Sequence, residues 1–84
     1  MAKVEMYSKD NCAYCVRAKQ LLEKKGVEYT EYRVDLDNAK LEEMLKRSEG
    51  KRSIPQIFID DDSIGGSDDL FALDAKGELD NLLK

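Results

Sequence analysis

The two cysteines of this chain, Cys12 and Cys15, are separated by two residues, and this spacing constrains the fold more than any other feature. An alternating apolar run, residues 3–8, precedes the pair, and a helix-like run, residues 13–25, follows it. This order predicts a strand-to-helix junction. A sulfur at a helix N-terminus lies near unpaired N–H groups and the positive end of the helix dipole, so we expect Cys12 to be rich in thiolate. Cys15, one turn further, is close enough to form a disulfide with it. We therefore predict a dithiol/disulfide redox site.

Length and charge limit the alternatives. The 84 residues suffice for one domain, residues 1–84, with one modest core. The net charge of −4 argues against a nucleic-acid partner, which needs concentrated Lys and Arg. No apolar run approaches the ~20 residues of a membrane span. The first residues carry no apolar segment typical of a secretory signal, so we expect a cytoplasmic location and no membrane partner.

The cysteine count favours chemistry over scaffolding. A pair this close encloses too small a loop to stabilise a fold, and in a reducing compartment such a pair is typically catalytic or metal-binding. The chain has no histidine, which rules out Cys–His nucleophilic catalysis within one chain. Two alternatives are inert buried thiols and half of a zinc site. A helix start exposes the first thiol, however, and zinc usually takes four ligands.

The remaining elements follow from periodicity and turn signals. Strands are predicted at residues 27–34 and 56–60, with a short strand ending at Ile64 after an Asp61-Asp62 turn. A helix is predicted at 39–47, and its charged residues are interpreted as a solvated face. A last helix begins at Ser67 as N-cap, is interrupted at Gly77 and continues over 78–83. In the first helix, Val16, Leu21 and Leu22 are predicted to form the apolar stripe.

This order of elements predicts an α/β fold. A strand, a helix and a strand within about 30 residues form a βαβ unit with parallel strands. An αββα unit follows, whose hairpin adds antiparallel strands. The expected result is a four-stranded mixed sheet with helices on both faces, which is the thioredoxin-like architecture around an N-terminal Cys-x-x-Cys.

Three segments of the chain resemble the signature segments of the glutaredoxins. They are residues 7–15 around the cysteines, residues 53–59 around the single proline, and residues 64–70 around Gly65-Gly66. The similarity covers essentially the whole chain, and the three segments together are far more specific than the Cys-x-x-Cys alone. The chain looks closest to the small bacterial dithiol glutaredoxins, and resembles the type-3 class.

The resemblance implies a glutathione-dependent thiol–disulfide oxidoreductase that reduces protein disulfides and removes glutathione from proteins. Cys12 is then the nucleophile and Cys15 the resolving thiol. Glutathione is the co-substrate, and the partners are glutathionylated or disulfide-containing proteins. The expectation is a monomer that holds no metal.

The resemblance also implies a glutathione site. The family's cis proline corresponds to Pro55, and the backbone of Ile54 pairs with the cysteinyl part of glutathione. Gly66, Ser67 and Asp68 correspond to the segment that holds the γ-glutamyl end. The remaining implied contacts are Lys9 to the glycine carboxylate, Arg52 assisting it, and Tyr14 as an aromatic wall beside the sulfur. Plainer interpretations remain open for these side chains: ordinary surface charges for Lys9 and Arg52, packing for Tyr14, and a helix-start acid for Asp68.

Two positions depart from the family pattern. Ala13 stands where many dithiol members have proline, which frees one backbone N–H at the helix start. It also opens an alternative function, an iron–sulfur cluster carrier in which two chains each give Cys12 and glutathione supplies the other thiolates. Ser67 stands where many relatives have a third cysteine, and this leaves the argument for glutathione intact.

Overall fold

The computed structural model describes residues 2–84, so Met1, which the expected domain of residues 1–84 includes, lies outside the described residues. The described strands are β1 Val4–Ser8, β2 Thr30–Arg33, β3 Gln56–Ile59 and β4 Asp62–Gly65. The helices are α1 Ala13–Lys24, α2 Asn38–Arg47, α3 Ser67–Ala75 and α4 Leu79–Leu82. None of the helices in this part of the chain combines the length and apolar character needed to cross a bilayer.

Within residues 2–84 the strands form one four-stranded sheet in the order β2-β1-β3-β4. β1 pairs with β2 in parallel, whereas β1 with β3 and β3 with β4 pair antiparallel. The predicted βαβ and αββα units and the mixed α/β sheet are therefore confirmed. β1 is an interior strand, and a short loop connects it to α1, so the cysteine pair lies just beyond the end of a buried strand.

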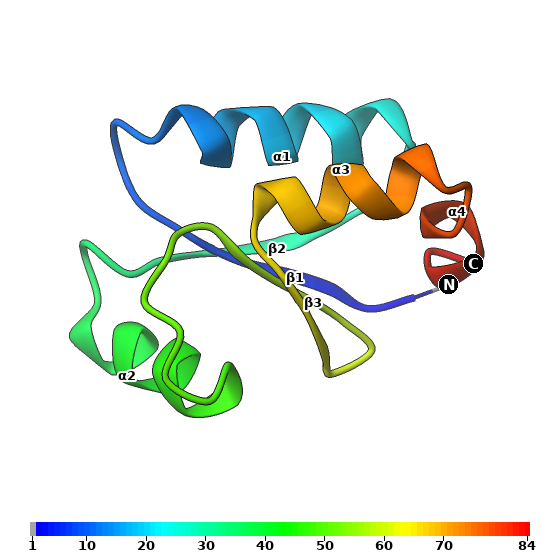
Figure 1. Cartoon of the computed structure of the whole chain (residues 1–84). Helices are drawn as coiled ribbons and strands as arrows, with labels where there is room; N and C mark the ends of the chain where they lie inside the picture. Colours follow the sequence, from blue (N-terminus) through cyan, green and yellow to red (C-terminus); the bar gives the residue numbers. More distant parts are fainter. Residues whose placement is uncertain (1) are drawn as a thin grey trace.

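The helices cover both faces of the sheet, with α1 and α3 on one side and α2 on the other (Figure 1). On the first side, the sheet residues Met6 and Ile57 pack against Leu22 of α1 and Leu70 of α3 in the larger apolar cluster. A smaller cluster on the other side joins Tyr7, Phe58, Val34 and Met44, the last from α2. Each Å² of apolar surface that these two clusters bury stabilises the fold by about 25 cal/mol, and this burial holds the helices against the sheet.

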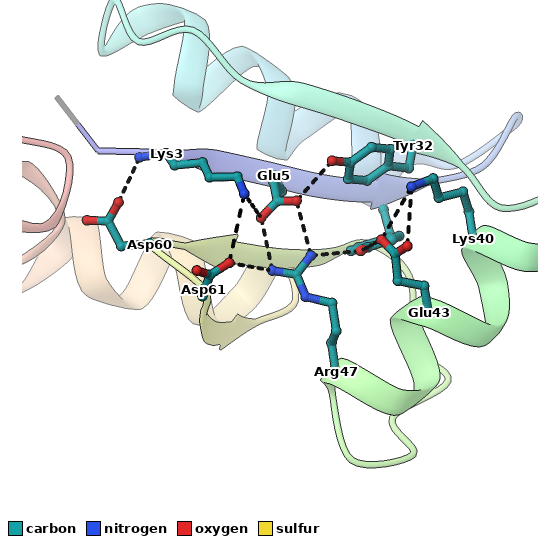
Figure 2. A network of polar contacts seen from close by, with 9 residues as sticks. Lys3, Glu5, Tyr32, Lys40, Glu43, Arg47, Asp60 and Asp61 are labelled. Atoms are coloured by element: carbon teal, nitrogen blue, oxygen red, sulfur yellow. Dashed lines mark hydrogen bonds and ion pairs between the residues drawn. The ribbon is translucent and has the colours of Figure 1, made fainter.

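The α2 side also contains a polar network, which Figure 2 shows. Arg47, in the last turn of α2, binds Glu5 of β1 with both guanidinium arms, at 2.9 and 3.2 Å. It also donates to the Tyr7 hydroxyl at 2.8 Å and lies 4.1 Å from the ring centre of Phe58. The prediction that the charged residues of this helix form a solvated face is therefore wrong for Arg47. Its partner Glu5 is only 4% exposed.

This network changes the protonation of its members. The hydrogen bond from Arg47 lowers the pKa of Glu5, against the opposing effect of burial. Burial, reinforced by the hydrogen bond that the hydroxyl donates to Glu43, raises the pKa of Tyr7 to about 12. Glu5 is thus held as an anion and Tyr7 as a neutral phenol.

Some element boundaries differ from the prediction. β2 begins at Thr30 instead of residue 27, because the Val27 N–H bonds back to the Leu22 carbonyl as α1 ends. β3 ends at Ile59, and the turn consists of Asp60 and Asp61, both with positive φ.

Three predicted helix details also need correction. The buried face of α1 contains Cys15, Ala18, Leu21 and Leu22, whereas Val16 is exposed. α2 begins one residue earlier than predicted, with Asp37 as its N-cap. The N-cap of α3 is Gly66, and Ser67 is the first helical residue.

Candidate active site

The cysteine pair lies at the N-terminus of α1, as its spacing predicts. Cys12 is the N-cap residue in extended conformation, and its sulfur accepts a hydrogen bond from the Cys15 N–H at 3.2 Å. The two residues form a disulfide, with 5.2 Å between their Cα atoms. The exposed fraction is 9% for Cys12 and 1% for Cys15. The helix-start N–H groups stabilise a negative charge on Cys12, which is also the more accessible of the two.

The loop before Cys12 is attached to the segment that follows β2. The Asp10 N–H donates to the Asp35 carboxylate at 3.3 Å, and Arg33 binds that carboxylate at 2.6 and 2.8 Å. The hydrogen bond from Arg33 lowers the pKa of Asp35 to about 2. Asp35 therefore stays an acceptor for the loop at physiological pH. This contact has no signature in the sequence, because its two residues are 25 positions apart and leave no local pattern.

The segment around the proline lies opposite the cysteines. The Ile54–Pro55 bond is cis, as the resemblance implies. The Ile54 carbonyl oxygen is 3.8 Å from the Cys12 sulfur. Pro55 is buried, whereas the preceding Ser53 is exposed. Because β3 is antiparallel to β1, the residues just before β3 lie beside the end of β1.

The N-terminus of α3 completes the site. The Asp69 carboxylate accepts a hydrogen bond from the Gly66 N–H at 3.0 Å and so caps the helix. A Cβ at Gly66 would lie 3.4 Å from the Pro55 carbonyl oxygen, an ordinary van der Waals contact, so the start of α3 lies directly beside the proline segment. The first N–H groups of a helix have no partner within it, and they attract anions.

These elements surround one groove of about 290 Å³. Its lining residues are Tyr14, Ser53, Ile54, Pro55, Gly66, Ser67, Asp68 and Asp69. The structure thus brings together the predicted binding residues of α1, the proline segment and α3. Lys9 and Arg52 are exposed and are not among the lining residues. Ser53 and Asp69 were missed, although both directly flank predicted residues in the sequence.

Tyr14 forms the outer wall of the groove. Its side chain is 53% exposed, and the guanidinium carbon of Arg17 lies 5.9 Å from its ring centre. Arg17 also lies 5.3 Å from the ring centre of Phe71 in α3. Cation–π contacts at exposed sites contribute about 0.5–1 kcal/mol each. Arg17 therefore links the exposed tyrosine to the third helix.

In the described residues, no three His, Cys, Asp or Glu side chains gather into a set that could hold a metal ion. The chemistry supported by the groups present is thiol–disulfide exchange at an accessible sulfur, beside a groove with an exposed backbone and a helix N-terminus.

Known proteins resemble this chain both in sequence and in structure. Residues 4–64 match the family model described as Glutaredoxin. The chain is 60% identical over 84 residues to glutaredoxin 3 of Escherichia coli, with 100% of both chains covered. It resembles the solution structure of glutaredoxin from Brucella melitensis, with 45% identity, a TM-score of 0.86 and 100% and 90% of the two chains covered. It also resembles the buckwheat glutaredoxin–glutathione complex, with 29% identity, a TM-score of 0.87 and 98% and 76% coverage.

Proposed function

The chain belongs to the glutaredoxin family, and on that premise we propose that its groove binds glutathione beside Cys12. The full-length likeness to glutaredoxin 3 bears out the resemblance to the small type-3 class. The protein is a glutathione-dependent thiol–disulfide oxidoreductase, and glutathione is its co-substrate. The observation that carries the proposed site is that the Ile54 carbonyl lies 3.8 Å from the Cys12 sulfur, at the edge of a groove closed by α3.

Cys12 acts as the nucleophile in the proposed mechanism. Its thiolate attacks the glutathione sulfur of a protein–glutathione mixed disulfide, the protein thiolate leaves and takes up a proton, and Cys12 carries the glutathionyl group. A second glutathione thiolate attacks that group, which releases oxidised glutathione and regenerates the Cys12 thiolate. The rate follows the thiolate fraction and the pKa of the leaving thiol.

Cys15 acts as the resolving thiol for protein disulfides. Cys12 first forms a mixed disulfide with the protein, and the Cys15 thiolate then attacks the Cys12 sulfur, which releases the reduced protein. Two glutathione molecules later reduce the Cys12–Cys15 disulfide and become oxidised glutathione. The 1% exposure of Cys15 supports this role, because a buried thiol reacts with its neighbour rather than with external disulfides.

Different residues of the groove are proposed to bind different parts of glutathione. The backbone of Ile54, next to Pro55, pairs with the cysteinyl part like an added strand. The N–H groups that follow Gly66 take the γ-glutamyl carboxylate, and Asp68 pairs with its ammonium.

Four further residues complete this proposal. Tyr14 covers the sulfur, and Ser67 supplies an N–H at the start of α3. Lys9 and Arg52 attract the glycine carboxylate, and because both are exposed and outside the lining, solvent screens their contribution.

The decisive experiment compares two mixed disulfides of one peptide, one with glutathione and one with mercaptoethanol. The groove predicts a much higher kcat/KM for the glutathionylated peptide, because only glutathione carries groups for Ile54 and the α3 N-terminus. Equal kcat/KM for the two peptides would contradict the proposed groove while leaving the dithiol chemistry in place.

We further propose that the protein works in the cytoplasm as a monomer, on glutathionylated or disulfide-containing proteins. Sedimentation of protein purified without oxygen tests the oligomeric state. A colourless monomer that turns over with glutathione is the expected result. A brown dimer would instead favour the cluster-carrier function, in which Cys12 of each chain is a ligand.

A further inference from the structure

Gln56, the first residue of β3, holds the proline segment through its side-chain amide. The residue is 1% exposed. Its Nε2 donates to the Ser53 carbonyl oxygen at 2.8 Å and to the Ser53 hydroxyl oxygen at 3.0 Å. Both bonds therefore end on one residue, three positions earlier in the chain and on the far side of the Ile54–Pro55 bond.

The two bonds enclose the part of the chain that faces the sulfur. Ser53, Ile54 and Pro55 all line the groove, and the Ile54 carbonyl lies 3.8 Å from the Cys12 sulfur. Pro55 has no N–H, so it cannot donate a backbone hydrogen bond that would hold this segment. The amide of Gln56 supplies the donor that the proline lacks.

The oxygen of the Gln56 amide, unlike its nitrogen, makes no hydrogen bond within the described residues. This atom, Oε1, is also buried. A buried acceptor without a partner lowers stability. A side chain of similar size without that acceptor, such as methionine, removes this penalty together with the two bonds to Ser53. Stability of the fold and shape of the groove are thus separable at this position.

We propose that Gln56 is a positioning residue for glutathione: it fixes Ser53, Ile54 and Pro55 in the shape that accepts the cysteinyl backbone. This inference rests on the proposed glutathione groove. Gln56 acts through the lining residues, since its amide bonds Ser53 and the residue is itself buried and not part of the lining.

The test is Gln56→Met, with Gln20→Met as the matched control, because Gln20 is an exposed glutamine on α1 away from the groove. We expect the KM for a glutathionylated peptide to rise about three- to tenfold, as the loss of two neutral hydrogen bonds predicts. We expect an unchanged kcat and little change in thermal stability. Lower stability with an unchanged KM would show a structural role only and overturn the proposal.

Gln56→Glu sharpens the result. The carboxylate has the size of the amide but no N–H, and it faces the Ser53 carbonyl oxygen. The KM should rise further than in Gln56→Met, whereas a KM at the wild-type value would contradict the role of the donor.

Ser53→Ala gives an independent measurement if the Gln56 variants fold poorly. It removes one of the two acceptors, so the KM should rise about two- to threefold. The effects of Ser53→Ala and Gln56→Met should also be less than additive when combined. An unchanged KM in Ser53→Ala, or full additivity, counts against the proposal.

Asp68→Ala separates this inference from the proposed function. If Asp68→Ala raises the KM and Gln56→Met does not, the groove binds glutathione and only the role of Gln56 is wrong. If neither variant changes the KM, the groove itself is not the glutathione site.

Discussion

The two faces of the sheet are held to their helices by different interactions. Beneath α1 and α3 the buried side chains are almost entirely apolar, from Met6 and Ile57 of the sheet to Leu22 and Leu70 of the helices. Beneath α2 the apolar cluster is smaller, and the Arg47 guanidinium lies against the ring of Phe58. Arg47 also pairs with Glu5 (Figure 2). The groove and both cysteines belong to the first face. The cysteine chemistry therefore depends on the α1/α3 face, whereas the Arg47 network of the α2 face contributes stability. Gln56, which lies directly opposite Tyr7 and so on the α2 face, is the exception, because we propose that it shapes the groove from that side.

The largest expected effect lies on the cysteine face. Cys12→Ser should lower turnover of every substrate by about 10³-fold or more, equivalent to about 4 kcal/mol of activation free energy, because no other accessible thiol is present. Cys15→Ser should retain removal of glutathione from a peptide and lose most reduction of a protein disulfide. Steady-state assays on both substrates give the measurement. Equal loss of both activities in Cys15→Ser would mean that the two roles are assigned wrongly.

On the α2 face, Arg47→Met should lower stability and spare activity. The variant leaves the carboxylate of Glu5 buried without its main cation, and breaking such a pair costs about 3–5 kcal/mol. Because Arg47 is partly exposed, we expect the lower part of that range. Urea unfolding measures the change, and Lys46→Met, at an exposed residue on the same helix turn, is the control. A large fall in kcat at a temperature where the variant is folded would contradict the assignment of the Arg47 network to stability alone.

The same pair predicts how stability changes in acid. The pKa of Glu5 is lower in the folded protein than its ordinary value of 4.5. Its charge therefore stabilises the fold fully above pH 4.5, and this contribution is lost as the pH falls through the lowered folded pKa. Glu5→Gln should make the acid loss of stability shallower, measured as unfolding free energy against pH. Glu42→Gln, at an exposed site, serves as the control. Parallel curves for wild type and Glu5→Gln would remove Glu5 from the acid response.

Sequence reasoning found the architecture because its signals are local. The Cys-x-x-Cys after an alternating run placed β1 and α1, and Gly77 marked the break between α3 and α4. It missed the pairing of Arg47 with Glu5, since the partners are 42 residues apart and lie on different elements. For the same reason it took the charges of α2 as a solvated face. Val16 was misplaced because the helix buries the side that contains Cys15, Ala18 and Leu22, which is about 100° to 160° away from Val16 around the helix axis.

The groove was anticipated through the family resemblance rather than through periodicity. The three segments that line it are far apart in the sequence, and only the resemblance related them. Ser53 and Asp69 were missed because their roles come from geometry: one accepts the Gln56 amide, and the other caps α3. The contributions of all the proposed contact residues to glutathione binding, Lys9, Arg52 and Asp68 among them, stay predictions.

Asp68→Ala and Lys9→Ala test those contributions on the groove face. Asp68 lines the groove, so its loss should raise the KM for a glutathionylated peptide about three- to tenfold, as expected for a partly solvated charged hydrogen bond. Lys9 lies outside the lining, and its loss should raise the KM twofold at most, an effect that added salt removes. The KM at low and high ionic strength is the measurement. A larger effect of Lys9→Ala than of Asp68→Ala would contradict the assignment of the stronger contact to the start of α3.

The smallest expected effect is a loss of stability on substitution of Lys40, which lies at the solvent-exposed edge of the network around Arg47. Lys40 lies 4.2 Å from the ring centre of Tyr32 and 3.3 Å from Glu43, but its side chain is partly exposed to solvent. Solvent screens such contacts, so Lys40→Met should lower stability by only about 0.5 kcal/mol, and less at high salt. Urea unfolding of this variant beside Arg47→Met gives the comparison. A loss near that of Arg47→Met would mean that the whole network acts as one unit, since Glu43 then depends on Lys40 to hold the hydroxyl of Tyr7 in place.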